Sequence, residues 1–318
     1  MKIVVLDGYT LNPGDLSWNK VAQLGELTVY DRTRPEEIVG RAIDADVVLT
    51  NKCVITATVL KQLPQLKYIG ELATGYNNID VAAARKQHII VTHIPAYSTD
   101  SVAQAVFAHL LNVINETALY AEEVRGGKWR HAKDFCYFRQ PLRELSSLTL
   151  GIVGLGHIGM RVANIAHAFG MNVFAYTSKN AAQLPEGIRK TTMEGLLAVS
   201  DVLTLHCPLT MENKEMINTE ILRKMRCGAI LINLSRGGLI CEEAVATALH
   251  EGHLRAYCAD VLTEEPPKNE HILLREPHAY ITPHIAWATV EARQRLLNIC
   301  IKNLENFIAG QPQNEVLV

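Results

Sequence analysis

The sequence predicts an α/β protein made of two domains, each built on a parallel sheet. Three observations predict this class. Short apolar segments alternate with helical segments twice along the chain. The 318 residues are enough for about two domains of roughly 150 residues each. A glycine-rich segment at the start of the second half is typical of a strand–turn–helix unit.

The first half contains five short apolar segments that we predict to be strands, at residues 3–6, 27–30, 47–50, 68–72 and 89–92. Helical segments are predicted between them at 16–24, from Pro35 onward and at 56–63, where Pro64 ends the helix. Helices that connect successive strands cover both faces of a parallel sheet, and the strands of such a sheet are short and apolar. We therefore expect a parallel sheet here.

A long helical stretch is predicted from about Ser98 to Arg125. Residues 98–100 are of the types that cap helix N-termini, and Gly126-Gly127 ends the stretch. Its apolar residues repeat at helical spacing, so it is too apolar for a solvated linker. We expect it to pack between domains or between subunits.

The second half contains about six predicted strands, at residues 148–153, 172–176, 202–205, 229–233, 256–261 and 280–282. Helical segments lie between them, and a final helix is predicted at 290–309. Six parallel strands are the number in a full dinucleotide-binding sheet of the Rossmann type.

Composition excludes several classes of protein. Lys and Arg number 31 and Asp and Glu 33, a formal charge of −2, so no strong field attracts nucleic acid or an anionic membrane. No apolar run approaches the roughly 18 residues of a membrane span. Residues 1–7 resemble a strand rather than a secretory signal. The seven cysteines are scattered and never spaced C-x-x-C, which favours a cytoplasmic protein without a structural metal.

The segment 151–159 carries the pattern G-x-G-x-x-G at Gly154, Gly156 and Gly159. It follows a predicted strand and precedes a predicted helix at 160–169. In this position the pattern is typical of a dinucleotide-binding turn. Gly154 permits the tight turn, Gly156 lets the backbone approach a pyrophosphate, and Gly159 lets the helix pack on the strand. The pattern therefore predicts a dinucleotide cofactor.

The strand at 172–176 should end in an acidic residue if the site holds the adenosine ribose of NAD. Thr177, Ser178 and Lys179 stand there instead. Without the acid, repulsion of a 2′-phosphate is lost, and Ser178 and Lys179 can bind that phosphate. Lys179 is equally compatible with a solvated loop, so the sequence leaves NAD and NADP open.

Charged residues follow three predicted strands of the second sheet. Arg236 follows the strand at 229–233, Glu264 and Glu265 follow the one at 256–261, and His284 follows the one at 280–282. Because the carboxyl ends of parallel strands meet at one edge, an Arg, a Glu and a His are expected to converge. The set suits reduction of a 2-keto acid: Arg clamps carboxylate and carbonyl, and His donates a proton. A neighbouring carboxylate favours the imidazolium.

These residues lie within segments that together resemble the D-isomer-specific 2-hydroxyacid dehydrogenase family over essentially the whole chain. The segments are residues 73–80, 151–159, 206–210, 233–238, 260–266 and 283–287. The resemblance implies that Arg236 binds and polarises the keto acid and that His284 is the acid in reduction and the base in oxidation. It implies that Glu265 pairs with His284; we choose it over Glu264 because it precedes Pro266 and lies five residues after Asp260.

The resemblance also implies further contacts with cofactor and substrate. Cofactor contacts are expected from Thr74, Gly154, Gly156, His157, Ile158, Gly159, Thr177, Ser178, Lys179, Cys207, Pro208, Leu234, Asp260, His284 and Ala286. Substrate contacts are expected from Lys52, Ala73, Thr74, Gly75, Arg236, His284 and Trp287. Two of these assignments stay open, because Lys52 is equally compatible with a surface lysine and Trp287 with a core aromatic residue.

The resemblance implies a discontinuous, flavodoxin-like substrate-binding domain at 1–98 and 288–318, and a Rossmann NAD(P)-binding domain at 99–287. A cleft that closes on the ligand and a homodimer are expected with it. No partner other than a small 2-keto or 2-hydroxy acid is expected, and neither nucleic acid nor a membrane.

The segment 284–287 is most similar to glycerate dehydrogenases, also called hydroxypyruvate reductases. Glu265 argues against a formate dehydrogenase, in which Gln is expected. We therefore expect hydroxypyruvate or glyoxylate reduction to D-glycerate or glycolate, with D-lactate dehydrogenase as the rival. A dinucleotide-sensing, corepressor-like binding protein is an alternative of a different class. The physiological substrate and the direction of flux stay open.

Overall fold

The computed structural model describes residues 1–268 and 270–317. The chain divides into two compact units, unit 1 with Met1–Ser98 and Ala288–Val318 and unit 2 with Thr99–Trp287. Each unit is built on one sheet in which every strand pairs in parallel with its neighbours. The predicted α/β class with two parallel sheets is confirmed.

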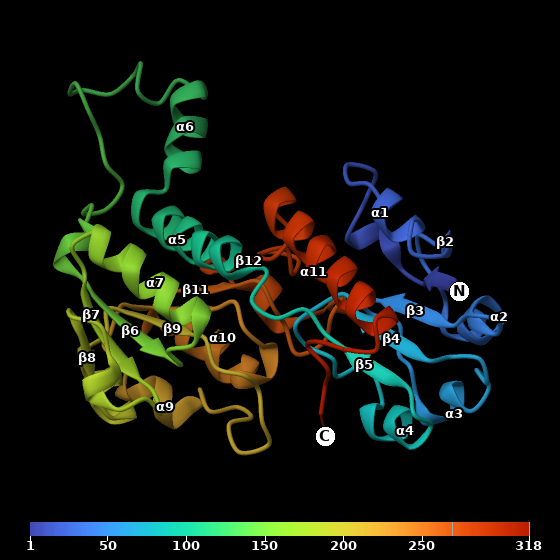
Figure 1. Ribbon diagram of the computed structural model, residues 1–318. Helices are drawn as coiled ribbons and strands as arrows, with labels where there is room; N and C mark the ends of the chain where they lie inside the picture. The colour runs from blue at the N-terminus through green and yellow to red at the C-terminus, as the bar shows by residue number, and fades with distance from the viewer. Residues whose placement is uncertain (269, 318) are drawn as a thin grey trace. The chain divides into compact units, whose positions relative to one another are not determined.

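Unit 1 has a five-stranded sheet in the order β2-β1-β3-β4-β5, which is the flavodoxin-like order. Its strands are β1 (Lys2–Val5), β2 (Glu26–Val29), β3 (Val47–Thr50), β4 (Tyr68–Glu71) and β5 (Ile90–Thr92). Its helices are α1 (Asn19–Ala22), α2 (Ile38–Ala42), α3 (Ala57–Leu60), α4 (Val81–Lys86) and α11 (Val290–Ile308) (Figure 1). Strands β3 and β4 are buried along their whole length, as short apolar strands in a covered sheet should be.

Helix α11 joins the last part of the chain to the first. The buried guanidinium of Arg293 forms two bonds of 2.7 and 2.6 Å to the Asp15 carboxylate. It also donates to the carbonyl oxygens of Leu11 and Ala288, each at 3.0 Å. Phe307 packs on Tyr68 of β4, with ring centroids 4.7 Å apart. Residues about 280 positions apart are thus held in one folded unit.

Unit 2 has a seven-stranded sheet in the order β12-β11-β10-β9-β6-β7-β8. Its strands are β6 (Thr149–Val153), β7 (Asn172–Tyr176), β8 (Ile188–Lys190), β9 (Val202–Leu205), β10 (Ala229–Asn233), β11 (Leu254–Ala259) and β12 (Ala279–Ile281). Its helices are α5 (Thr99–Asn115), α6 (Thr117–Arg125), α7 (His157–Ala168), α8 (Met193–Val199), α9 (Thr219–Lys224) and α10 (Glu242–His250). Counted from β6, the order is the Rossmann order 3-2-1-4-5-6 with one strand added.

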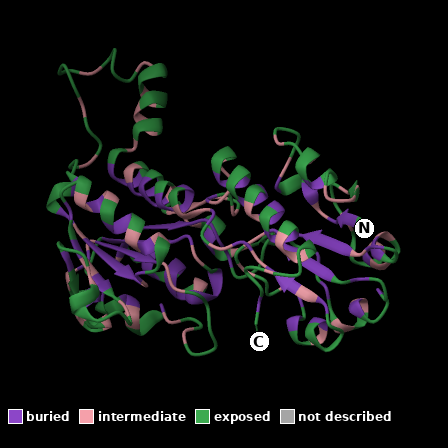
Figure 2. Cartoon of the chain, in the orientation of Figure 1, coloured by how far each residue is buried: buried purple, intermediate pink, exposed green. Residues whose placement is uncertain are grey.

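Apolar clusters cover both faces of the unit 2 sheet. Ile230 and Ile232 of β10 belong to the cluster shared with α5 and α7, whereas Ala229 and Leu231 belong to the cluster shared with α8 to α10. Successive side chains of a strand point to opposite faces, so a strand covered on both sides needs an unbroken apolar run. The inner strands β3, β4, β9 and β10 are accordingly buried along their whole length, whereas the edge strands β2 and β8 have exposed positions (Figure 2).

Three predictions of secondary structure were wrong in extent. The second sheet has seven strands, because β8 is a short edge strand with two exposed positions and little apolar signal. The predicted helix at 98–125 is two helices, because Glu116 adopts a left-handed conformation, with φ of 47°, between α5 and α6. The predicted helix at 16–24 is only the short α1.

Helix α6 and the segment 126–144 that follows it project from the rest of unit 2 (Figure 1). Helix α6 has no buried residue. Large hydrophobic side chains are exposed along this part of the chain, at Val124, Trp129, Phe135, Phe138 and Leu142. Among the described residues, no helix is long and apolar enough to cross a membrane, and no group of three or more His, Cys, Asp and Glu side chains is arranged to hold a metal ion.

Candidate active site

Unit 2 contains a cavity of about 650 Å³ at the carboxyl ends of β6, β7 and β9. The strand order reverses between β6 and β9, and in open α/β sheets ligands bind at such a switch point. The lining includes seven of the predicted cofactor residues: Gly154, Gly156, Thr177, Ser178, Lys179, Cys207 and Pro208. It also includes residues that were not predicted, among them Tyr176, Met193, His206, Glu212 and Asn213.

The three glycines of the segment 151–159 meet different constraints. At Gly154, with φ of 91°, an added Cβ would lie 2.8 Å from the backbone of His206. At Gly159 it would lie 2.2 Å from the carbonyl oxygen of Gly154. At Gly156, by contrast, an added Cβ would meet nothing within 4 Å. Protein packing therefore requires glycine at 154 and 159, while the open space at Gly156 fits close approach by a dinucleotide phosphate.

Helix α7 begins directly after Gly156, so His157 and Ile158 lie in its first turn. The first amide N–H groups of a helix have no acceptor within the helix, and the helix dipole places partial positive charge there. No side chain caps this end of the helix. These features fit an anionic ligand.

Thr177, Ser178 and Lys179, which directly follow β7, also line the cavity. The backbone N–H of Lys179 donates to the Thr177 hydroxyl at 3.3 Å. The Nζ of Lys190, on the neighbouring strand β8, donates to the carbonyl oxygen of Lys179 at 2.6 Å. A second ammonium group therefore adjoins this turn. Burial lowers the pKa of His206 to about 4, so that ring adds no positive charge at neutral pH.

The predicted catalytic residues follow three neighbouring strands that are in register. Asn233 of β10 pairs with Ala259 of β11, and Ala259 pairs with Ile281 of β12. Arg236 follows the end of β10 by three positions, and His284 follows the end of β12 by three. Neighbouring strands lie about 4.8 Å apart, so these segments leave the same edge of the sheet side by side.

His284 and Glu265 contact each other directly, with Nδ1 2.6 Å from Oε2. The other Glu265 oxygen, Oε1, accepts from the Leu262 N–H at 2.9 Å, which fixes the carboxylate. Both side chains are about one-third exposed. A carboxylate at Nδ1 orients the ring and stabilises its charged form, so Nε2 is the nitrogen that can exchange a proton with a ligand.

Asp260 holds the backbone on which His284 lies. Its buried carboxylate accepts the N–H groups of Ile285 and Ala286, at 2.8 and 2.7 Å. It also accepts from the Thr282 hydroxyl at 2.6 Å. His284 itself is left-handed, with φ of 54°, a conformation that non-glycine residues adopt only when their surroundings impose it. The Asp260 bonds on both sides of His284 supply that constraint.

Two residues of α5 that the sequence did not single out contact the same segment. The Ser101 hydroxyl donates to the carbonyl oxygen of Ala286 at 2.5 Å. The buried His109 ring places Nε2 3.3 Å from the Thr282 hydroxyl. Only the helical spacing of these residues was visible in the sequence, and it carries no information about which distant loop they touch.

Arg236 is exposed, and its Nη1 donates to the carbonyl oxygen of Ser235 at 2.8 Å. Its backbone is held by Asn233, whose Nδ2 donates to the Arg236 carbonyl oxygen at 2.8 Å. The Ser235 hydroxyl donates to the Cys207 carbonyl oxygen at 2.7 Å. The loop is thus joined to the lining of the cavity, although Arg236, Glu265 and His284 are not among the described residues that line it. Leu234 is buried in the core.

Trp287 is half-buried, and its Nε1 donates to the carbonyl oxygen of His284 at 2.8 Å. It therefore contacts the backbone of His284. The alternative of a core aromatic residue does not fit this partial exposure.

The predicted substrate residues of unit 1 lie in two loops at the carboxyl end of its own sheet. Lys52 follows β3, and residues 73–75 follow β4. The Asp7 carboxylate holds the first loop by accepting the N–H groups of Asn51, Lys52 and Cys53, at 2.8, 2.6 and 3.1 Å. In the second loop the Thr74 hydroxyl donates to the Ile94 carbonyl oxygen at 2.7 Å.

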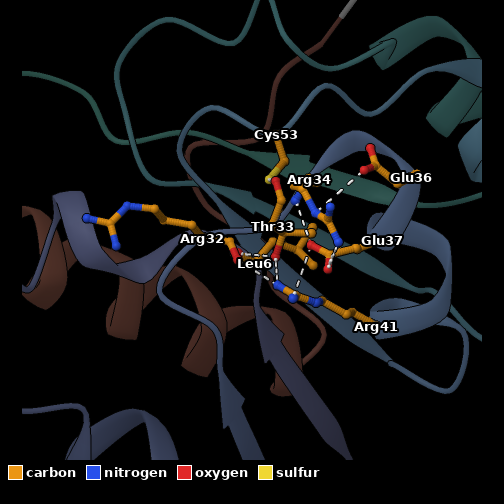
Figure 3. Close-up of polar contacts among 8 residues, drawn as sticks. All are labelled: Leu6, Arg32, Thr33, Arg34, Glu36, Glu37, Arg41 and Cys53. Carbon is orange, nitrogen blue, oxygen red and sulfur yellow. Dashed lines mark hydrogen bonds and ion pairs between the residues drawn. The ribbon is translucent and has the colours of Figure 1, made fainter.

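The loop after β3 is also held from the segment that follows β2. The Sγ of Cys53 lies 3.8 Å from the carbonyl oxygen of Thr33 (Figure 3). The Thr33 hydroxyl donates to the Leu6 carbonyl oxygen and accepts from Nη1 of Arg41 at 2.7 Å. Loops after three neighbouring strands are thereby joined at the edge where parallel sheets bind ligands.

Comparisons with known proteins agree with this geometry. The sequence model for the NAD binding domain of the D-isomer specific 2-hydroxyacid dehydrogenases matches residues 107–286, more than half of the chain. The chain is 44% identical to a hydroxypyruvate reductase of Blautia hydrogenotrophica, with 99% of each protein covered. It is 40% identical to a glycerate dehydrogenase of Methylorubrum extorquens, covering 99% of this chain and 98% of that protein.

Among solved structures, an acyclic imino acid reductase (Bsp5) in complex with NADPH and D-Arg covers 100% of both chains. It has a TM-score of 0.87 and is 30% identical in sequence. The matched family model, the two relatives and the shared fold lead to one assignment. The chain belongs to the D-isomer-specific 2-hydroxyacid dehydrogenase family.

Proposed function

We propose that the protein catalyses reversible hydride transfer between NAD(P)H and a small 2-keto acid, with hydroxypyruvate and glyoxylate as the preferred substrates. The observation that carries the proposal is the 2.6 Å contact between His284, which follows β12, and Glu265, which follows β11. Arg236 follows β10, the other neighbour of β11. The names of the relatives from Blautia and Methylorubrum support these substrates. The products are D-glycerate and glycolate.

Three residues of unit 2 perform the reaction in this proposal. When bound, the cofactor supplies or accepts a hydride at its nicotinamide ring. The Arg236 guanidinium holds the substrate carboxylate and polarises the carbonyl oxygen. His284 delivers a proton from Nε2 to that oxygen during reduction and takes it back during oxidation. Glu265 orients the ring through Nδ1 and stabilises the imidazolium, as the acid of a catalytic triad does for its histidine.

Other residues hold the two ligands. Asp260, Leu234 and Ala286 would contact the nicotinamide end of the cofactor, and His157 and Ile158 would contact its pyrophosphate. Unit 1 is the substrate-binding domain in this proposal, and unit 2 is the NAD(P)-binding domain. The backbone N–H groups of Thr74 and Gly75 would bind the substrate carboxylate, with Ala73 and Lys52 beside them.

The protein is further proposed to be a cytoplasmic homodimer. The projecting segment from α6 to residue 144 exposes Trp129, Phe135 and Phe138, which are 54%, 89% and 67% accessible. Large apolar side chains exposed along one segment are typical of a protein–protein contact. A second copy of the chain is the partner that the family resemblance suggests. The seven cysteines are all free thiols, which is compatible with a reducing compartment.

A panel of keto acids assayed with each reduced cofactor tests the proposed function. Hydroxypyruvate and glyoxylate should be reduced with a kcat/KM above that of pyruvate, because pocket contacts distinguish substrates that differ by one group. The measurement is the loss of NADH or NADPH absorbance at 340 nm. Tight dinucleotide binding without turnover of any acid would instead favour the corepressor-like alternative.

Replacing Glu265 by Gln should lower kcat/KM for hydroxypyruvate reduction about tenfold or more. The amide keeps the shape of the side chain but not the negative charge that orients the His284 ring and stabilises the imidazolium at the 2.6 Å contact. The measurement is kcat/KM for hydroxypyruvate at saturating dinucleotide. Glu264→Gln is the matched control, because Glu264 is adjacent in sequence but pairs with Lys268 at 2.9 Å. Equal kcat/KM values in Glu265→Gln and Glu264→Gln would contradict the assignment.

Replacing Lys179 by Ala should weaken NADPH more than NADH, because only NADPH carries the 2′-phosphate that the turn after β7 would bind. We expect the KM for NADPH to rise about tenfold, the scale of one lost charged hydrogen bond, with the KM for NADH nearly unchanged. Lys224→Ala, an exposed lysine of α9 paired with Glu220, is the control. Equal effects on both cofactors would remove Lys179 from phosphate recognition.

A further inference from the structure

Glu71 is a charged residue type in a fully buried position. It is the last residue of β4, and its exposed fraction is 0%. Its Oε2 accepts from Nδ2 of Asn78 at 3.0 Å. Its Oε1 is buried and has no hydrogen-bond partner among the residues that the structure describes. A buried carboxylate without a cation within hydrogen-bond distance is costly, and such groups stay protonated.

The groups around Glu71 favour the neutral acid. Burial, the largest cause, and the Asp7 carboxylate raise the pKa of Glu71 to about 9, while Asn78 and the Lys52 ammonium act in the opposite direction. Asp7 is already satisfied by the three backbone N–H groups of residues 51–53. The Cys53 thiol also faces Glu71, and burial raises its pKa to about 12. At neutral pH, Glu71 and Cys53 are therefore both uncharged.

Asn78 transmits the position of Glu71 to two loops. The same Nδ2 that contacts Glu71 donates to the Cys53 carbonyl oxygen at 3.1 Å. The Asn78 carbonyl oxygen accepts from the Ile55 N–H at 2.8 Å. Asn78 thus joins the segment 73–78 after β4 to the segment 52–55 after β3. These are the two segments of unit 1 that carry the proposed substrate contacts, Lys52 in one and Thr74 with Gly75 in the other.

We propose that Glu71 is a positioning residue for substrate binding, which, through Asn78, holds the segments 52–55 and 73–78 in a fixed relation. This inference rests on the proposed function for its link to substrate. The consequence for pH follows from the charge. When Glu71 loses its proton, a second carboxylate appears near Asp7. The Glu71 carboxylate then competes with an anionic substrate for the Lys52 ammonium. An anionic substrate should then bind more weakly, so KM for the acid rises above about pH 9.

The kinetic test compares Glu71→Gln and Glu71→Leu with the wild type. Gln is neutral and keeps an oxygen for Asn78, so its KM at pH 7.5 should lie within about twofold of wild type. Leu keeps the volume but removes the acceptor, so KM for the keto acid should rise about tenfold, with kcat and the KM for the dinucleotide nearly unchanged. Tyr68→Phe is the matched control, because Tyr68 lies on β4 with Glu71 and the change removes a buried hydrogen bond of 2.5 Å to Thr92 of β5.

The pH dependence is measured in the direction of D-glycerate oxidation, in which His284 takes up a proton instead of supplying one. At pH 10 the KM of wild type should be about tenfold above that of Glu71→Gln, whereas at pH 7.5 the two should agree. The KM ratio changes in this direction because the two proteins differ in one titrating group: wild type loses the proton of Glu71 between pH 7.5 and pH 10, and Gln has no such proton. A KM ratio that does not change with pH would overturn the proposal.

Two readouts do not depend on catalysis. Hydrogen exchange of the peptide that spans 72–80 should be faster in Glu71→Leu than in wild type and Tyr68→Phe. Because the folded state of wild type keeps a proton that the unfolded state loses above the usual Glu pKa of 4.5, its stability must fall as pH rises from there to about 9. Relative to Glu71→Gln, the unfolding equilibrium constant should rise about tenfold per pH unit.

These readouts separate failure of this inference from failure of the proposed function. No turnover by the wild type would reject the proposed substrates, and exchange at 72–80 would still decide whether Glu71 holds the loop. If Glu71→Leu does not fold, the pH dependence of the KM ratio between wild type and Glu71→Gln alone tests the proposal. Unaltered exchange at 72–80, or equal KM increases in Glu71→Leu and Tyr68→Phe, would reject the positioning role.

Discussion

The contact between His284 and Glu265 is the interaction on which the proposed chemistry depends. A free imidazole on a loop would sample many orientations, and most of them would place neither nitrogen toward a substrate. The 2.6 Å contact at Nδ1 fixes the ring, and Asp260 fixes the left-handed backbone that carries it. The site therefore separates two tasks. The buried carboxylate of Asp260 holds the loop, and the one-third-exposed carboxylate of Glu265 stabilises the charge that proton transfer creates and removes.

Both units use the same property of parallel sheets, which is that their carboxyl edges collect loops from distant parts of the chain. In unit 2 those loops are joined by short bonds, from Asn233 to Arg236 and from Ser235 to Cys207. In unit 1, Asp7 joins the end of β1 to the loop after β3, and Asn78 joins that loop to the one after β4. In each unit a buried acid lies beneath the loops, Asp260 in one and Glu71 in the other. The two differ in their partners, because Asp260 accepts two N–H groups and a hydroxyl whereas Glu71 accepts one amide.

Much of this arrangement could be predicted from the sequence, because it rests on local patterns. The segment 151–159 predicts a strand, a turn and a helix, and the structure has β6 and α7 there. Strands β3, β7, β9 and β10 begin and end where the apolar runs do. Other features depend on tertiary packing and left no local signal. They include the edge strand β8, the helix break at Glu116, and the contacts of Ser101 and His109 with a loop more than 170 positions away. The protonation of Glu71 depends on its burial, and one polar residue at the end of an apolar run does not show in the sequence whether it is buried.

The rate of keto-acid reduction by His284→Gln tests the central claim most directly, provided dinucleotide binding is measured on the same sample by quenching of tryptophan fluorescence. Loss of a positioned proton donor should lower kcat by about a hundredfold or more while dinucleotide affinity stays near that of wild type. His250→Gln, at the exposed end of α10, should have wild-type kcat. A wild-type kcat in His284→Gln would contradict the account, because the proton would then come from another group.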